Sequence, residues 1–168
     1  MTAINVNGLK FSFPPNWKTV KFDDWSFYRK QFMPIRDKIK AVDLIAIAPD
    51  GTTWFIEAKD YRRHSREDSI DLGAVIVDKL FNTLAAILPA KVNANDPTER
   101  EFAREILRAT RLKVVFHLEQ PARPSRLHPR AFNPADIQQK LRKRLKAIDA
   151  HPLVVEKAEM RSLAWSVQ

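Results

Sequence analysis

Three charged residues lie within or at the ends of apolar runs of this sequence: Asp43, Glu57 and Lys59. The two runs are rich in branched and aromatic side chains, which is typical of β-strands. Pro49-Asp50-Gly51 between them fits a three-residue hairpin loop, because proline sets φ at the first turn position and glycine accepts the left-handed one. We therefore expect two acids and an amine on one β-hairpin.

The length of the loop sets how the two strands pair. With 49–51 as the loop, Asp43 lies directly opposite Glu57, so both point to the same face with Cβ atoms roughly 4.5 to 5.5 Å apart. Lys59 is two residues beyond Glu57 and shares that face. A two-residue loop would shift the pairing by one residue and send Asp43 to the other face. The fit of Pro-Asp-Gly to the longer loop favours the first pairing.

Two opposed carboxylates repel each other, and near a core each unpaired charge costs several kcal/mol. A divalent cation between Asp43 and Glu57 would remove both penalties, and hard oxygen ligands suit Mg²⁺ or Mn²⁺. The Lys59 amine would then point to the same place, where it could stabilise negative charge or orient a water. A pair of surface charges without chemistry is the plainer interpretation of the Glu-x-Lys triplet.

The pattern of Asp43, a hairpin, and then Glu57-Ala58-Lys59 resembles the D…(D/E)-x-K signature of the PD-(D/E)XK nucleases, the restriction-endonuclease-like superfamily. The resemblance covers about the first ninety residues. It implies that Asp43 and Glu57 bind metal, that the main-chain carbonyl of Ala58 is an extra ligand, and that Lys59 assists the attacking water. One departure is that Val42 stands where the signature has proline.

The composition bounds the class of protein. A chain of 168 residues suits a single domain, and a hydrophobic content of 45% is enough for a real core. The absence of cysteine excludes disulfides and thiolate metal sites. The N-terminus does not read as a signal sequence, and no apolar run approaches the ~20 residues that cross a bilayer. We expect a soluble, cytoplasmic protein without a membrane partner.

The net charge of +9 favours a polyanionic partner, above all nucleic acid, with DNA favoured over RNA. Arg62 and Arg63 follow Lys59 in a polar loop and are placed for phosphates of the backbone. A solvated loop is the alternative.

A helix is predicted over 71–88 and stops at Pro89. Its apolar stripe is Val77, Leu80, Phe81, Leu84 and Leu88, and Lys79 and Asn82 lie away from that stripe. The resemblance suggests Lys79 as a basic residue added to the site, where it would contact nucleic acid, and Asp24 as a candidate fourth acid.

Further elements follow from local patterns. Asp96-Pro97-Thr98-Glu99 combines a cap, a proline at the first position and an acid at the third, which predicts a helix to about Thr110. Asn133 starts another helix, whose exposed face is basic. The other predicted elements are a strand at 9–13, a strand near 18–22, a short helix near 24–33, a strand at 112–118 and closing strands within 152–168.

These patterns predict an α/β domain over residues 1–168, with a mixed central sheet flanked by helices and the hairpin at 41–59 in its middle. Its nuclease-like core spans about 18–118, with the basic helix and closing strands at about 133–168. The leading hypothesis is a Mg²⁺- or Mn²⁺-dependent nuclease, which the resemblance allows to pair as a homodimer. The alternatives are a non-catalytic nucleic-acid-binding module and a protein whose basic helix docks an acidic partner.

Overall fold

The computed structural model describes residues 1–62, 70–127 and 129–168. Its elements follow the chain in the order β1 (Thr2–Val6), β2 (Leu9–Phe13), β3 (Lys18–Lys21), η1 (Phe22–Asp24), η2 (Tyr28–Phe32), η3 (Met33–Ile35), β4 (Leu44–Ile47), β5 (Thr52–Asp60), α1 (Leu72–Asn93), α2 (Pro97–Ile106), β6 (Arg111–Glu119), α3 (Pro134–Arg144), β7 (Leu153–Val155) and β8 (Ser166–Val167). The predicted α/β class is confirmed.

The strands of the described residues form two sheets. The main sheet has the order β3-β4-β5-β6-β7. Its first three strands pair antiparallel, whereas β5, β6 and β7 pair parallel, so the sheet is mixed as predicted. A small antiparallel sheet of order β1-β2-β8 joins the two ends of the chain. The β4–β5 hairpin thus occupies the centre of the main sheet.

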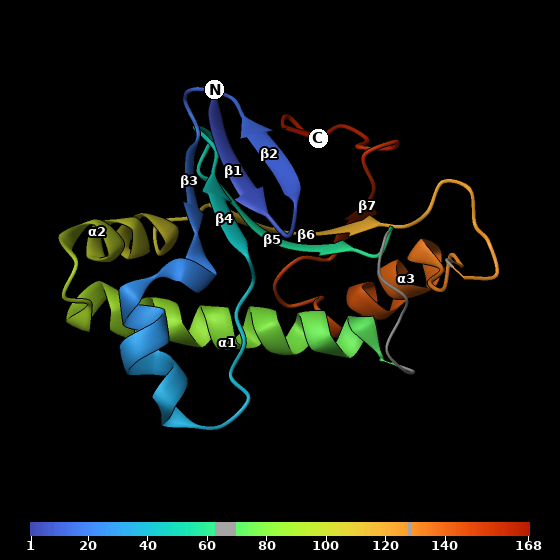
Figure 1. The fold of residues 1–168 in the computed structure, drawn as a ribbon. Coiled ribbons are helices and arrows are strands. Elements are labelled where there is room, and N and C mark those ends of the chain that lie inside the picture. Colours follow the sequence, from blue (N-terminus) through green and yellow to red (C-terminus); the bar gives the residue numbers. More distant parts are fainter. Residues whose placement is uncertain (63–69, 128) are drawn as a thin grey trace.

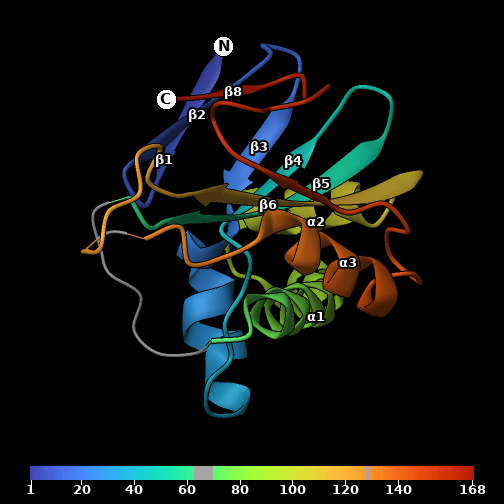
Figure 2. The same ribbon diagram turned by 90° about the vertical axis from the view of Figure 1, so that its right-hand side faces the viewer.

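The layers are visible in two orthogonal views (Figures 1 and 2): α1 and α3 cover one face of the main sheet, and the β1–β2 hairpin lies over the other. Side chains alternate between these layers. Ile45 and Phe55 belong to the core under the helices, while Leu44 and Ile56 belong to the core under the small sheet. Burial of both faces explains why the hairpin strands read as nearly continuous apolar runs.

The predicted pairing of the hairpin is confirmed. Ile45 pairs with Phe55 and Ile47 with Thr53, and the Ala48 N–H donates to the Thr52 carbonyl at 2.9 Å. Gly51 has a φ of +78°, the left-handed conformation that closes a three-residue loop. One further step along this pairing places Asp43, just before β4, opposite Glu57.

The helix predicted over 71–88 is longer than expected. We expected Pro89 to end it, but α1 continues through that proline to Asn93. A proline removes one hydrogen bond to the carbonyl four residues earlier, here that of Ala85. Ala85 is exposed, so water can replace the lost N–H partner. The prediction also misplaced the buried face, because Phe81 and Leu88 are 67% and 59% exposed.

The other helices differ from prediction mainly at their ends. The segment near 24–33 forms η1, η2 and η3, short 3₁₀ and π turns, instead of one regular helix. Asp96 caps α2 as predicted, but the helix ends at Ile106, before the expected Thr110. Asn133 caps α3. The aromatic side chains of Phe22, Trp25 and Tyr28 pack against one another in the core.

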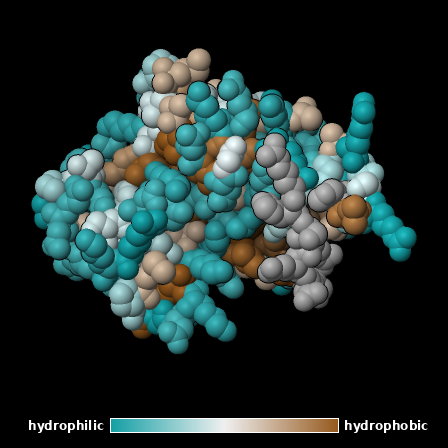
Figure 3. Space-filling model, viewed as in Figure 1, coloured by the Kyte–Doolittle hydropathy of each residue, from teal (hydrophilic) through white to brown (hydrophobic). Residues whose placement is uncertain are grey.

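One helix of the described residues, α1, is long and apolar enough to cross a membrane by length and composition alone. Half of its most apolar window is buried inside the molecule. The sequence prediction missed this length because it stopped the helix at Pro89. The face of the molecule seen in Figure 3 is largely hydrophilic, with separate apolar patches.

Candidate active site

The structure brings together Asp43, Glu57 and Lys59, the three residues singled out by spacing, and adds Lys79 from α1. Lys59 Nζ lies 3.5 Å from Glu57 Oε1. Lys79 Nζ lies 2.5 Å from the same oxygen and 3.9 Å from Asp43 Oδ1. The other oxygen of Asp43 accepts a hydrogen bond from the Ala58 N–H at 2.8 Å. Two acids and two amines therefore meet on the helix-covered face of the main sheet.

The site is buried at its acidic end and opens at Lys59. The exposed fractions of the side chains are 1% for Glu57, 8% for Asp43, 10% for Lys79 and 33% for Lys59. Burial, and then the neighbouring Asp43 carboxylate, raise the pKa of Glu57 to about 7, although Lys79 and Lys59 lower it. The cost of removing this carboxyl from water exceeds the attraction of the two ammonium groups. Perturbation of this kind is common at functional sites.

Lys79 occupies a different place from the one that its sequence pattern suggested. We expected it to lie away from the buried stripe of α1, but both Lys79 and Asn82 are buried. The stripe was misassigned because Phe81 and Leu88 were counted toward the core. The signal that could have located Lys79 is its spacing from Ile76, Leu80 and Thr83, which are all buried on the same side of α1.

Hydrogen bonds fix the chain around the acids. Thr83 Oγ1 accepts from the Val42 N–H at 3.0 Å and donates to the Lys79 carbonyl at 2.8 Å. Asn82 Nδ2 donates to the Lys40 carbonyl at 3.1 Å. The helix that carries Lys79 therefore also holds the segment that leads into Asp43.

The backbone of Ala58 has partners on the edge of β5 that faces Asp43. Its N–H donates to the Asp43 carboxylate, and its carbonyl accepts a hydrogen bond from Asn7 Nδ2 at 3.0 Å. Asn7 lies in the tight turn between β1 and β2, with a positive φ of 50°. The carbonyl predicted to be an extra metal ligand thus already has one protein partner. A second lone pair of that oxygen stays open to another ligand.

Of the two neighbouring acids near the start of η1, Asp23 and not Asp24 lies beside Asp43. Asp24 is ion-paired with Lys21 and Arg29. Asp23 lines a cavity of about 280 Å³ together with Asp43 and Lys79. Its buried Oδ1 has no hydrogen-bond partner, and the nearest ammonium, that of Lys21, lies 4.0 Å away. Burial raises the pKa of Asp23, and the Asp43 carboxylate contributes in the same direction.

The donor set can be compared with the needs of a divalent cation. Among the described residues, no three histidine, cysteine or acidic side chains are arranged to hold a metal ion. Asp43 and Glu57 supply two carboxylates, and Mg²⁺ is commonly held by one or two carboxylates with water and substrate oxygens. Glu57 Oε2 is buried and lacks a hydrogen-bond partner, so it has a free acceptor. These residues fit a single Mg²⁺ or Mn²⁺ ion.

The structure shows where two of the three residues predicted to bind nucleic acid lie. Arg62 forms an ion pair with Asp60 at 2.7 Å and remains 39% exposed. Arg63 lies outside the described residues. Lys79 was expected to contact nucleic acid, but its ammonium group is directed at the two carboxylates. The roles of all three in binding nucleic acid remain predictions.

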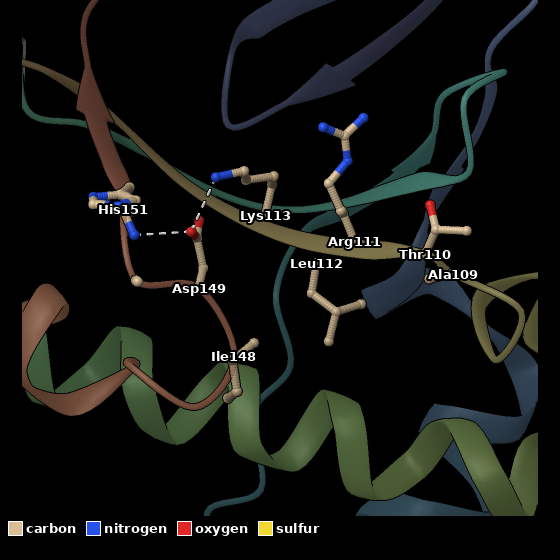
Figure 4. A pocket seen from close by; sticks show the side chains of 9 residues that line it. Ala109, Thr110, Arg111, Leu112, Lys113, Ile148, Asp149 and His151 are labelled. Carbon is tan, nitrogen blue, oxygen red and sulfur yellow. Dashed lines mark hydrogen bonds and ion pairs between the residues drawn. The ribbon is translucent and has the colours of Figure 1, made fainter.

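A second cavity of about 430 Å³ lies at the opposite end of β6 and contains none of the predicted site residues. Figure 4 shows Asp149 in its wall, with Lys113 and His151 beside it. Asp149 accepts from Lys113 Nζ at 3.2 Å and from the N–H groups of Val114 and His151, both at 2.9 Å. Asp149 therefore has an evident structural role, because it holds the start of β6 to the loop before β7.

The chain resembles a known protein over nearly its whole length. The chain is 27% identical to a cysteine–tRNA ligase of Neisseria meningitidis serogroup A over an alignment 211 positions long, which covers 99% of this chain. It spans 30% of the length of that ligase. No family model matches the chain. No solved structure matches it either.

Proposed function

We propose that this protein is a metal-dependent nuclease of the PD-(D/E)XK type that hydrolyses phosphodiester bonds. The observation that supports the proposal is the arrangement of Asp43, Glu57 and Lys59 on one face of the central hairpin, the arrangement that the signature requires. The net charge of +9 fits a nucleic-acid substrate. The raised pKa of Glu57 fits a functional carboxyl.

In this proposal Asp43 and Glu57 hold one Mg²⁺ or Mn²⁺ ion. The ion would supply Lewis acidity, which activates a water and neutralises charge on the phosphate. Lys59, the most exposed of the four charged groups, would orient the attacking water or stabilise the developing negative charge. The hydrogen bond between the Ala58 N–H and Asp43 would keep one oxygen of that carboxylate in place.

The sequence favoured DNA over RNA as the substrate, but the relative reported above is named as a tRNA ligase. RNA, and tRNA in particular, is therefore included as a substrate of equal standing. The chain spans less than a third of that ligase, so the ligase's own activity is not transferred to it.

The test is a cleavage assay on single- and double-stranded DNA, single-stranded RNA and tRNA with Mg²⁺, Mn²⁺ or EDTA. We expect cleavage only with metal, and a loss of about 100-fold or more in Asp43→Asn, Glu57→Gln and Lys59→Met. Lys91→Met, an exposed lysine at the end of α1, is the matched control. No cleavage of any substrate, or cleavage that survives all three site substitutions, would contradict the proposal.

A second candidate is a nucleic-acid-binding module without catalysis. One observation favours it: the ammonium of Lys79 already compensates the repulsion between Asp43 and Glu57 that was expected to require a metal. Two acids and two lysines give a charge-balanced cluster. Binding that is insensitive to EDTA, weakens steeply with salt and is unaccompanied by cleavage would support this candidate.

A further inference from the structure

The position of the Lys79 ammonium group has a consequence for metal binding. Its Nζ is in contact with Glu57 Oε1 at 2.5 Å and lies 3.9 Å from Asp43 Oδ1. Asp43 Oδ2 is bonded to the Ala58 N–H, so Asp43 Oδ1 and Glu57 Oε1 are the carboxylate oxygens that the ammonium approaches. A cation that bridges these same two oxygens would occupy the place where the ammonium lies.

Lys59 does not compete in the same way. Its Nζ approaches only Glu57, at 3.5 Å, and its side chain is 33% exposed. The Lys59 ammonium can therefore move into solvent. The Lys79 side chain is only 10% exposed, so its ammonium has no comparable access to solvent.

The cavity beside the site offers Lys79 another position. It measures about 280 Å³ and is lined by Lys79, Asp43 and Asp23, with Tyr28 and Met33 among the other residues. Asp23 Oδ1 is buried and without a hydrogen-bond partner. It is the acceptor in this cavity that could receive the ammonium, since the Lys21 ammonium is no closer to it than 4.0 Å.

We infer that Lys79 acts as an internal competitor of the divalent ion: it bridges Asp43 and Glu57 in the metal-free protein and moves toward Asp23 when the ion binds. This inference rests on the proposed function for the identity of the metal ligands. It adds that the Lys79 ammonium occupies the metal-free site. The affinity for the divalent ion then depends on the free energy of exchanging that ammonium for the ion.

The test measures Mn²⁺ binding by electron paramagnetic resonance or calorimetry on chelator-treated protein, without any nucleic acid. Lys79→Met removes the competitor and should tighten Mn²⁺ binding at least tenfold. Lys91→Met, at an exposed lysine near the end of the same helix, is the control and should change it less than threefold. Glu57→Gln should abolish binding in the wild-type and Lys79→Met backgrounds. Equal or weaker binding by Lys79→Met, or no binding by either protein, overturns the inference.

Because Lys79→Met leaves two buried carboxylates without a counter-ion, it can fail to fold. Lys79→Arg keeps the charge and holds both carboxylates more firmly through its planar fork, so it should weaken Mn²⁺ binding about tenfold. Unchanged Mn²⁺ affinity in Lys79→Arg overturns the inference. Tighter binding in Lys79→Met with no cleavage of any substrate would remove the nuclease proposal and leave the competition intact.

Discussion

Thr83 and Val42 are far apart in the sequence, but Thr83 Oγ1 accepts a hydrogen bond from the Val42 backbone N–H at 3.0 Å. The same hydroxyl donates to the Lys79 carbonyl at 2.8 Å. One side chain on α1 therefore connects the residue before Asp43 to the helical turn that carries Lys79. This connection positions the acid on the sheet relative to the lysine on the helix.

Replacing Thr83 with alanine should destabilise the protein by about 1 to 3 kcal/mol, because the buried Val42 N–H loses its partner. Thr83→Ser keeps the hydroxyl and should lose less. Urea unfolding monitored by circular dichroism measures both. Equal stability of the alanine and serine variants would show that the hydroxyl does not hold this segment.

The pKa of Glu57 gives a prediction for stability as a function of pH. The folded-state pKa of about 7 lies above the ordinary value of 4.5, so the folded protein holds a proton that the unfolded chain releases. The stabilising contribution is complete below about pH 4.5 and is lost as pH rises through about 7. Its full size is about 3 kcal/mol. Glu57→Gln should flatten this decline between pH 5 and pH 7.

The measurement is urea unfolding of wild type and Glu57→Gln at pH 5, 6 and 7, with EDTA present so that no metal binds Glu57. Glu101→Gln, an exposed acid on α2, is the control and should leave the pH dependence unchanged. A parallel decline in wild type and Glu57→Gln would mean that another group titrates.

Part of the site could be predicted from sequence because hairpin pairing is a local property. Loop length and side-chain alternation place Asp43 opposite Glu57 without any knowledge of the rest of the fold. The position of Lys79 depends on how α1 packs against the sheet. Its helix has apolar residues on more than one face, including the exposed Phe81 and Leu88. Periodicity alone therefore could not identify the buried side.

The ends of the elements were less predictable for a similar reason. Pro89 ordinarily marks the end of a helix, but the carbonyl that it deprives of a partner belongs to an exposed residue, so the penalty is small. The small sheet also escaped prediction as a unit. β8 joins β2 only through long-range contacts between the chain ends, with Phe11 opposite Val167, and no local pattern encodes that pairing.

Two glycines offer a matched test of the turn that sets the hairpin pairing. Gly51 and Gly8 have similar positive φ angles, +78° and +81°. A Cβ at Gly51 would lie 2.9 Å from Thr110 Oγ1, whereas one at Gly8 would meet nothing within 4 Å. Alanine at Gly8 should therefore cost only the backbone strain, about 1 to 2 kcal/mol. Gly51→Ala should cost more, by thermal or urea unfolding.

The contact with Thr110 can be separated from the strain by the double variant Gly51→Ala/Thr110→Ser. Serine removes the Thr110 methyl group and can turn its hydroxyl away, which should recover part of the extra loss. An equal cost for Gly8→Ala and Gly51→Ala would show that the space next to Thr110 is not limiting.

The basic face of α3 gives a prediction about nucleic-acid binding that applies to both candidate functions. Lys140 and Arg144 lie 3.5 and 3.9 Å from Asp71, so their charges are partly compensated. Arg142 and Lys143 on α3, and Lys146 just beyond its end, are exposed, and within the described parts of the chain no acid lies within ion-pair distance of them. If these three contact phosphates, replacing them with glutamine should weaken binding to B-DNA and reduce the slope of log affinity against log salt by up to about 3.

A control with the same change of net charge distinguishes contact from general attraction. Lys10, Lys91 and Arg108 are exposed on β2, at the end of α1 and after α2, away from α3. Their replacement with glutamine removes the same three charges, so long-range attraction falls similarly while the α3 contacts persist. The salt slope of this control should therefore stay close to that of wild type. Equal slopes for the two triple variants would mean that α3 is a solvated face and that nucleic acid is bound elsewhere.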